Sequence, residues 1–90
     1  MKEEAKQINL DTIINKDGIV IRWPKKKAEK LAVLQYLQTK FSKNKTYTEL
    51  EVNLILKKWN YFNDHALLRR ELYDNFLINR YNDGKSYWID

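Results

Sequence analysis

The segment Thr48-Glu49-Leu50-Glu51 constrains the fold more tightly than any other part of the chain. It has the form of a capping box, in which a threonine caps a helix and a glutamate three residues later reaches back to it. Tyr47 and Val52 flank the box at the two positions of a hydrophobic staple. We therefore predict a helix from Thr48 to about Trp59. Because its apolar side chains fall on two opposite faces, we expect neighbours to pack on both sides. One face holds Val52, Ile55, Leu56 and Trp59, and the other holds Leu50 and Leu54.

A second helix is predicted before this one. It begins near Pro24, a residue that suits the first turn of a helix, and runs to about Phe41. The apolar stripe at helical spacing comprises Leu34, Leu37 and Phe41, with Leu31 beside it. Val33 and Tyr36 fall on the far side of the helix. They need cover of their own, from the N-terminal segment or from a second subunit.

A third helix is predicted from a cap at Asp64 or Asn63 to about Asp74. Its buried side is marked by Leu68, Leu72 and Phe76. Arg70 projects to the opposite side. Asn75 is expected to take the left-handed backbone conformation that ends many helices.

The C-terminal residues predict a β-hairpin. Residues 77–81 and 86–89 have the composition of strands, and Asn82-Asp83-Gly84 between them is a strong turn signal. A minimal strand is also predicted at Thr46-Tyr47. The order of helix, short strand, two helices and hairpin predicts a mainly helical α+β domain of winged-helix type, with the hairpin as its wing.

The winged-helix-like domain is assigned to residues 18–90 and an N-terminal segment to residues 1–17. Residues 8–14 fit either a short helix or a strand that pairs, across Asp17-Gly18, with a strand at residues 19–23. Both alternatives stay open at this point. A chain of 90 residues is expected to form one domain overall.

The composition excludes several classes of protein and site. The absence of cysteine rules out disulfides and thiolate zinc sites, and it favours the cytoplasm. No apolar run approaches the ~20 residues of a membrane span, and the acidic first residues predict no signal peptide. A single histidine, His65, makes no convincing metal site, so we assign it a structural hydrogen-bonding role. We expect no metal, no cofactor and no enzymatic activity.

The net charge of +5 permits nucleic-acid binding. Our leading hypothesis is a small DNA-binding, transcription-associated protein that contacts double-stranded DNA with the third helix and the wing. The candidate base contacts are Arg69, Arg70 and Tyr73, and the candidate phosphate contacts are Lys57, Lys58, Arg80 and Lys85. Three acids on the third helix oppose this hypothesis, because a duplex is itself densely negative; they are Asp64, Glu71 and Asp74.

The alternative hypothesis is a protein–protein interaction or dimerisation module with no nucleic-acid role. Its partner is another protein or a second copy of the chain. Its candidate contacts are Val33, Tyr36, Leu50 and Leu54. This hypothesis predicts scattered basic residues and an exposed apolar patch larger than a few hundred Å². DNA binding predicts instead a basic stripe over the third helix and wing.

Several motifs in order resemble a bacterial family known as domain of unknown function 2087. They are Trp23-Pro24-Lys25-Lys26, Val33-Leu34-Gln35-Tyr36-Leu37, Tyr47-Thr48-Glu49-Leu50-Glu51-Val52-Asn53, Asn63-Asp64-His65-Ala66-Leu67-Leu68-Arg69-Arg70-Glu71-Leu72, and Asp83-Gly84 with Tyr87-Trp88. The resemblance covers residues ~18–90 and departs at Asn75, where the family pattern tends to have glycine. It implies a bacterial origin and a winged-helix-like fold. The family has no established activity, although some members adjoin a DNA-binding helix-turn-helix, so the resemblance points only weakly towards regulation.

Overall fold

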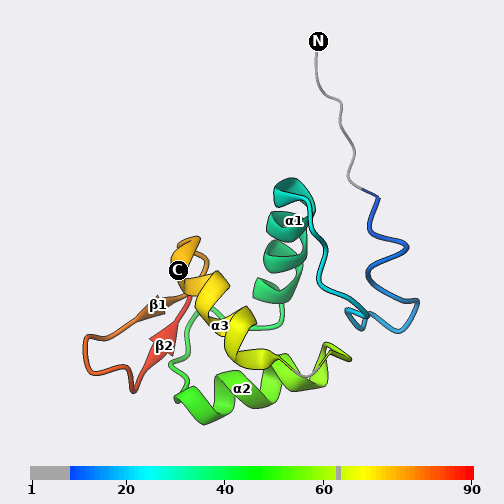
Figure 1. Cartoon of the computed structure of the whole chain (residues 1–90). Helices are drawn as coiled ribbons and strands as arrows, with labels where there is room; N and C mark the ends of the chain where they lie inside the picture. The colour runs from blue at the N-terminus through cyan, green and yellow to red at the C-terminus, as the bar shows by residue number, and fades with distance from the viewer. Residues whose placement is uncertain (1–8, 63) are drawn as a thin grey trace.

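Three helices followed by a two-stranded hairpin make up the described part of the chain, which is residues 9–62 and 64–90 of a computed structural model. The helices are α1 (Lys27–Gln38), α2 (Glu49–Lys58) and α3 (His65–Asp74), and the strands are β1 (Asn79–Arg80) and β2 (Tyr87–Trp88). Figure 1 shows them in this order along the chain. The predicted mainly helical α+β class, with a C-terminal hairpin as wing, is confirmed.

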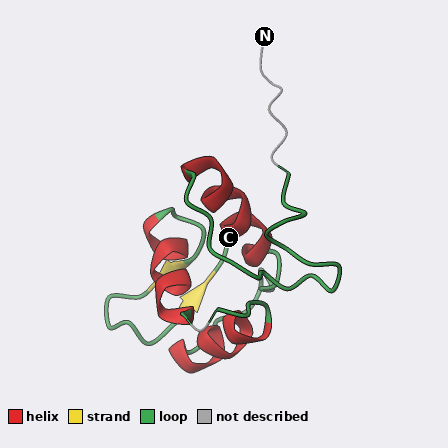
Figure 2. Ribbon diagram, turned by 45° about the vertical axis from the view of Figure 1, so that its right-hand side comes forward, coloured by secondary structure: helices red, strands yellow, loops and turns green. Residues whose placement is uncertain are grey.

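Helix α3 packs against both α1 and α2. Figure 2 shows the three helices around a common centre, with the hairpin beside α3. Residues from every helix, from the hairpin and from the N-terminal segment form one buried cluster. It comprises Ile13, Val20, Val33, Leu34, Leu37, Phe41, Tyr47, Val52, Leu56, Leu68, Leu72, Ile78, Tyr87 and Ile89.

The start of α2 follows the capping box. The Thr48 side-chain oxygen accepts a hydrogen bond from the backbone N–H of Glu51 at 3.1 Å, and Glu51 Oε1 accepts one from the N–H of Thr48 at 2.9 Å. Tyr47 and Val52 are both buried, as the staple requires. The helix ends at a cap on Trp59. Both predicted ends of this helix are therefore confirmed.

The expectation that α2 is buried on two faces is wrong. Leu50 is 66% exposed and Leu54 is 55% exposed, whereas Val52 and Leu56 are fully buried. The reason is that α3 and the core lie on one side of α2, and no element of the described chain covers the Leu50 and Leu54 side. Helix α2 thus has a free apolar face.

Helix α1 is shorter than predicted at both ends. Its first residue is Lys27, so Pro24 precedes the helix and is buried outside it. Its side chains Leu34 and Leu37 are buried as expected. Val33 is also fully buried. The cover of Tyr36 comes from the N-terminal segment, since its hydroxyl donates a hydrogen bond to the carbonyl oxygen of Gly18 at 2.5 Å.

The described N-terminal residues form a tight turn with isolated bridges. Ile14 pairs antiparallel with Val20, and Val20 pairs parallel with Asn60 in the connection between α2 and α3. Gly18 turns the chain with a φ of 81°, where an L side chain would be strained. The expected strand at residues 19–23 is thus reduced to one bridging residue. Of the alternatives for residues 8–14, the described part forms a turn and a bridge, and residue 8 lies outside the described residues.

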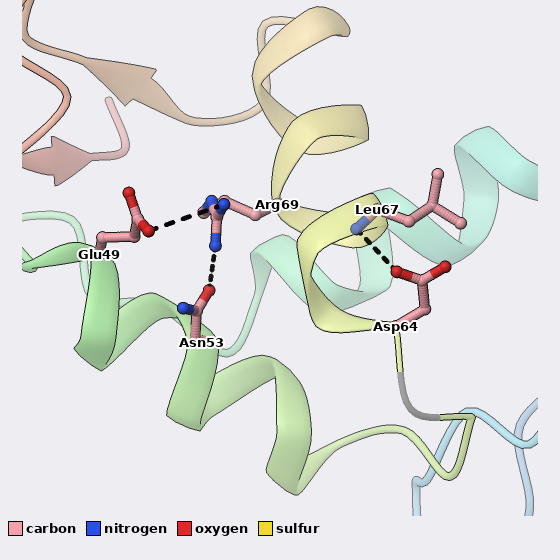
Figure 3. A network of polar contacts seen from close by, with 5 residues as sticks. All are labelled: Glu49, Asn53, Asp64, Leu67 and Arg69. Carbon is pink, nitrogen blue, oxygen red and sulfur yellow. Dashed lines mark hydrogen bonds and ion pairs between the residues drawn. The ribbon is translucent and has the colours of Figure 1, made fainter.

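Helix α3 begins where predicted. The Asp64 carboxylate accepts a hydrogen bond from the backbone N–H of Leu67 at 3.2 Å (Figure 3). The alternative cap, residue 63, lies outside the described residues. Leu68 and Leu72 are buried, which confirms the inner side of the helix.

The end of α3 differs from the prediction by one residue. Asn75 has a φ of −98°, and Phe76 takes the left-handed conformation with a φ of 61°. The N–H groups of Phe76 and Leu77 donate to the carbonyls of Tyr73 and Leu72, at 3.1 and 2.8 Å. This is the Schellman pattern with Phe76 as the residue beyond the cap. Phe76 was expected in the core, but the turn directs its side chain outward, where it is 90% exposed.

The two-stranded sheet is flanked by Tyr47, which precedes the cap of α2 and forms an isolated antiparallel bridge with β2. In the hairpin, Asn79 lies opposite Trp88 and Arg80 opposite Tyr87. Tyr47 exchanges two backbone hydrogen bonds with Tyr87, at 2.7 and 2.8 Å. The spatial order is therefore residue 47, β2, β1. The minimal strand predicted at Thr46-Tyr47 is reduced to one bridging residue, and the hairpin strands are shorter than expected around a turn at Gly84.

Candidate nucleic-acid interface

A polar pocket lies at the junction of α3, the hairpin and the start of α2. It has a volume of about 260 Å³ and brings together four of the predicted nucleic-acid contacts. The lining residues are Glu49, Arg69, Arg70, Tyr73, Asp74, Arg80 and Tyr87. Three guanidinium groups and two carboxylates therefore share one depression, with two phenol rings between them.

Arg70 is the most accessible of these cations. Its side chain is 81% exposed on the outer side of α3, as the helical pattern predicted. Its Nε lies 3.7 Å from an oxygen of Asp74, one turn further along the helix. An exposed pair of this kind contributes little to stability. Arg70 can therefore leave Asp74 for a stronger anionic partner at little cost.

Arg80 lies beside two tyrosines. Its guanidinium carbon is 4.5 Å from the centre of the Tyr73 ring, within the range of a cation–π contact. Polar contact with Tyr87, followed by the influence of Tyr73, raises the pKa of Arg80 above its ordinary value. The group stays charged at any physiological pH. Arg80 on β1 is thus linked to α3 through Tyr73.

Arg69 has a different environment from Arg70. It donates a hydrogen bond to Asn53 Oδ1, and its Nη2 lies 3.8 Å from a carboxylate oxygen of Glu49 (Figure 3). Its side chain is only 21% exposed. Both partners belong to α2, so Arg69 ties α2 to α3. The predicted role of Arg69 as a base contact has less support from this geometry than its structural alternative.

The predicted lysine contacts do not join the pocket. Lys57 and Lys58 are exposed at the end of α2, and Figure 1 shows α2 running away from the hairpin. Lys58 Nζ lies 5.5 Å from the centre of the Trp59 ring. Lys85 is exposed directly after Gly84, at the tip of the hairpin. The predicted cations therefore lie in at least two separate places.

The structure places two further lysines near the wing that the sequence did not assign to it. A depression of about 340 Å³ is lined by Lys43 and Lys45 from the loop before α2, and by Tyr81 and Trp88 from the hairpin. The rings of Tyr81 and Trp88 are 4.6 Å apart. The proximity results from the pairing of Tyr47 with Tyr87, which only the tertiary structure reveals.

The residues of the alternative interface divide into two kinds. Val33 is buried in the core. Tyr36 is half-buried because the N-terminal segment partly covers it. Val33 is therefore not accessible to a partner in this structure, and Tyr36 is only partly so. Leu50 and Leu54 are accessible on α2. Only this second pair offers a surface.

His65 shows no hydrogen-bonding role at one of its ring nitrogens. Its Nδ1 is buried and has no hydrogen-bond partner within residues 9–62 and 64–90. The same part of the chain contains no group of three side chains suited to hold a metal ion. None of its helices is long and apolar enough to cross a membrane.

Comparison with known proteins supplies a family. A family model described as an uncharacterized protein conserved in bacteria (DUF2087) matches residues 19–89. The chain belongs to this family. No curated protein and no solved structure matches the chain. The family description names bacteria and gives no activity.

Proposed function

We propose that this bacterial domain binds double-stranded DNA with the outer side of α3 and the adjacent wing. The observation that carries the proposal is the convergence of Arg70, Tyr73 and Arg80 at one pocket between these two elements. In winged-helix proteins of this element order, the second helix of the helix-turn-helix is the one that enters a groove. The proposed anion contacts are Arg70 and Arg80.

The local balance of charge favours contact with the DNA backbone over reading of bases. Arg70 and Arg80 carry charge at the pocket, but Asp74 partly neutralises Arg70. A phosphate, which is fully charged and sits at the surface of the duplex, competes with one exposed carboxylate better than a neutral base does. Lys85 at the wing tip, and Lys43 and Lys45 beside the wing, extend the proposed backbone contacts.

The test is fluorescence anisotropy of a labelled duplex of random sequence, titrated at low and at higher salt. We expect binding that weakens as salt rises, because each phosphate contact releases counterions. Arg70→Ala and Arg80→Ala should each reduce affinity and lower the slope of log affinity against log salt by about 1.

Lys16→Ala is the matched control, because it removes one exposed positive charge from the N-terminal segment instead of the pocket. It should leave the salt slope unchanged. Equal losses from Arg70→Ala and Lys16→Ala would contradict a specific role of the pocket. Absence of binding at low salt would contradict the proposal as a whole, since non-specific affinities are ~10⁻⁴–10⁻⁶ M even at physiological salt.

We also propose that the protein acts in the cytoplasm by binding and is not an enzyme. Its support is the composition: a chain without cysteine has no thiol nucleophile and suits a reducing compartment. A second candidate function, protein–protein interaction without nucleic acid, is favoured by the exposure of Leu50 and Leu54. A DNA titration with no signal would favour it.

A further inference from the structure

The outer face of α2 carries an apolar centre between opposite charges. We define this face as Leu50, Glu51, Leu54, Lys57 and Lys58, all of which are exposed. Helix α2 packs on α3 and the core with its other side. The two exposed leucines lie one turn apart and form an apolar patch rimmed by charged residues, which is the character of a contact surface.

The charges on this face have opposite signs before and after Leu54 along the helix. Glu51 precedes Leu54 by three residues and Lys58 follows it by four, which is ~4.5 Å and ~6 Å along the axis. At 3.6 residues per turn, Glu51 and Lys58 lie on the same flank of Leu54. Leu50 and Lys57 share the opposite flank. The face is therefore acidic before its centre and basic after it.

We propose that this face binds a second copy of the chain, with the two α2 helices antiparallel around a two-fold axis at Leu54. In this arrangement Leu54 packs against Leu54 of the partner subunit, and Glu51 faces Lys58 of the partner subunit. Leu50 packs against the aliphatic stem of Lys57 of the partner subunit. Charge complementarity thus selects this occupant and this orientation.

A parallel pairing of the same faces is disfavoured by the same charges. It would place each flank against the opposite flank of the partner subunit at the same height, so that Lys58 meets Lys57 of the partner subunit and Glu51 meets Leu50 of the partner subunit instead of a cation. The antiparallel pairing also opposes the two helix dipoles, which is the favourable alignment. Glu51 uses Oε1 in the capping box, and its second carboxylate oxygen stays available to a lysine.

The first measurement is the mass of the full chain in solution by sedimentation equilibrium over a dilution series. We expect a species of twice the 11.0 kDa mass of the chain, which dissociates on dilution. Leu54→Glu should remain monomeric at every concentration, with an unchanged far-ultraviolet circular dichroism spectrum, because Leu54 lies outside the core. A wild-type chain that is monomeric at every concentration overturns the proposal.

Cysteine substitution tests the position of the two-fold axis, because the chain contains no cysteine of its own. Leu54→Cys should form a disulfide-linked dimer under mild oxidation. Leu50→Cys is the matched control and should not, since the two copies of residue 50 would be ~12 Å apart along the axis, beyond the reach of a disulfide. Equal cross-linking of both variants overturns the antiparallel arrangement.

Charge reversal tests the predicted ion pair, and a mixture of two variants separates its effect from the loss of the capping contact of Glu51. Glu51→Lys and Lys58→Glu should each weaken self-association about tenfold or more, because each places like charges together. A mixture of the two variants should form a heterodimer in which both pairs are complementary again. Recovery of association in the mixture supports the proposal, and failure to recover it overturns the predicted pairing of residues 51 and 58.

Discussion

The hydroxyl oxygen of Tyr36 lies 2.5 Å from the carbonyl oxygen of Gly18, to which it donates a hydrogen bond. Gly18 has a φ of 81°, and a Cβ atom added to it would lie 2.7 Å from the same hydroxyl. The contact therefore joins α1 to the N-terminal turn at a position that only glycine fits. It explains why Tyr36, on the side of α1 away from its leucine stripe, is not free in solvent.

Replacement of Tyr36 by phenylalanine should destabilise the protein by about 1 kcal/mol, because it leaves a partly buried carbonyl without its donor. Chemical denaturation measured by circular dichroism would give the free energy of unfolding. Tyr61→Phe is the control, because Tyr61 is exposed and its change should stay within ~0.5 kcal/mol. Equal effects of the two substitutions would count against the proposed contact.

Phe76→Gly should stabilise the protein by about 1 kcal/mol. Phe76 has a φ of 61°, which costs a non-glycine residue roughly 1–2 kcal/mol, and its exposed ring contributes little burial. Thermal unfolding would show a higher midpoint temperature for this variant.

The neighbouring substitution Asn75→Gly should have the opposite sign. Asn75 does not need a positive φ, and its side-chain amide donates to the carbonyl of Glu71 at 2.8 Å. Loss of that bond and the greater freedom of glycine should lower stability by about 1 kcal/mol. Stabilisation by Asn75→Gly but not by Phe76→Gly would contradict the left-handed conformation of Phe76.

Removal of the cap of α2 should have a local cost. Thr48→Ala takes away the acceptor of the Glu51 N–H and should destabilise the protein by about 1 kcal/mol. Thr46→Ala, two residues earlier and exposed, should have little effect. Urea denaturation of both variants beside the wild type measures the difference, and similar midpoints for the two would contradict the role of the cap.

The Arg69 contact between α2 and α3 should matter more than the surface pair of Arg70. Asn53→Ala deprives the part-buried Arg69 of its acceptor and should cost about 1–1.5 kcal/mol. Asp74→Ala removes the exposed partner of Arg70 and should stay within ~0.5 kcal/mol. Thermal unfolding separates the two cases, and the reverse order of midpoints would overturn this assignment.

Sequence reasoning succeeded where a feature is determined within a few residues. The capping box of Thr48 and Glu51, the cap at Asp64 and the hairpin turn at Gly84 are all local, and each is found where expected. The outward direction of Arg70 also follows from the helical period alone. Local chemistry and periodicity therefore accounted for the order of the elements and for one side of the candidate site.

The remaining features depend on which segments meet in space. The apolar spacing of Leu50 and Leu54 identified a second face of α2, but spacing does not reveal whether a neighbour covers it. The left-handed conformation falls at Phe76 because the N–H of the next residue, Leu77, bonds back to the carbonyl of Leu72. It does not follow from the intrinsic preference of phenylalanine. The separation of Lys57 and Lys58 from the wing likewise depends on the direction in which α2 runs.

Two long-range backbone bridges among the described residues overlap along the sequence. One joins residue 20 to residue 60, and the other joins residue 47 to residue 87, so each closes a loop that contains one end of the other. Any break of the chain between residues 20 and 87 separates at least one pair of partners. Closing each loop costs chain entropy, and the bridge contacts that offset this cost form only when both ends of the loop are present. No fragment cut within this span should keep both bridges, and the domain is expected to unfold in a single cooperative transition.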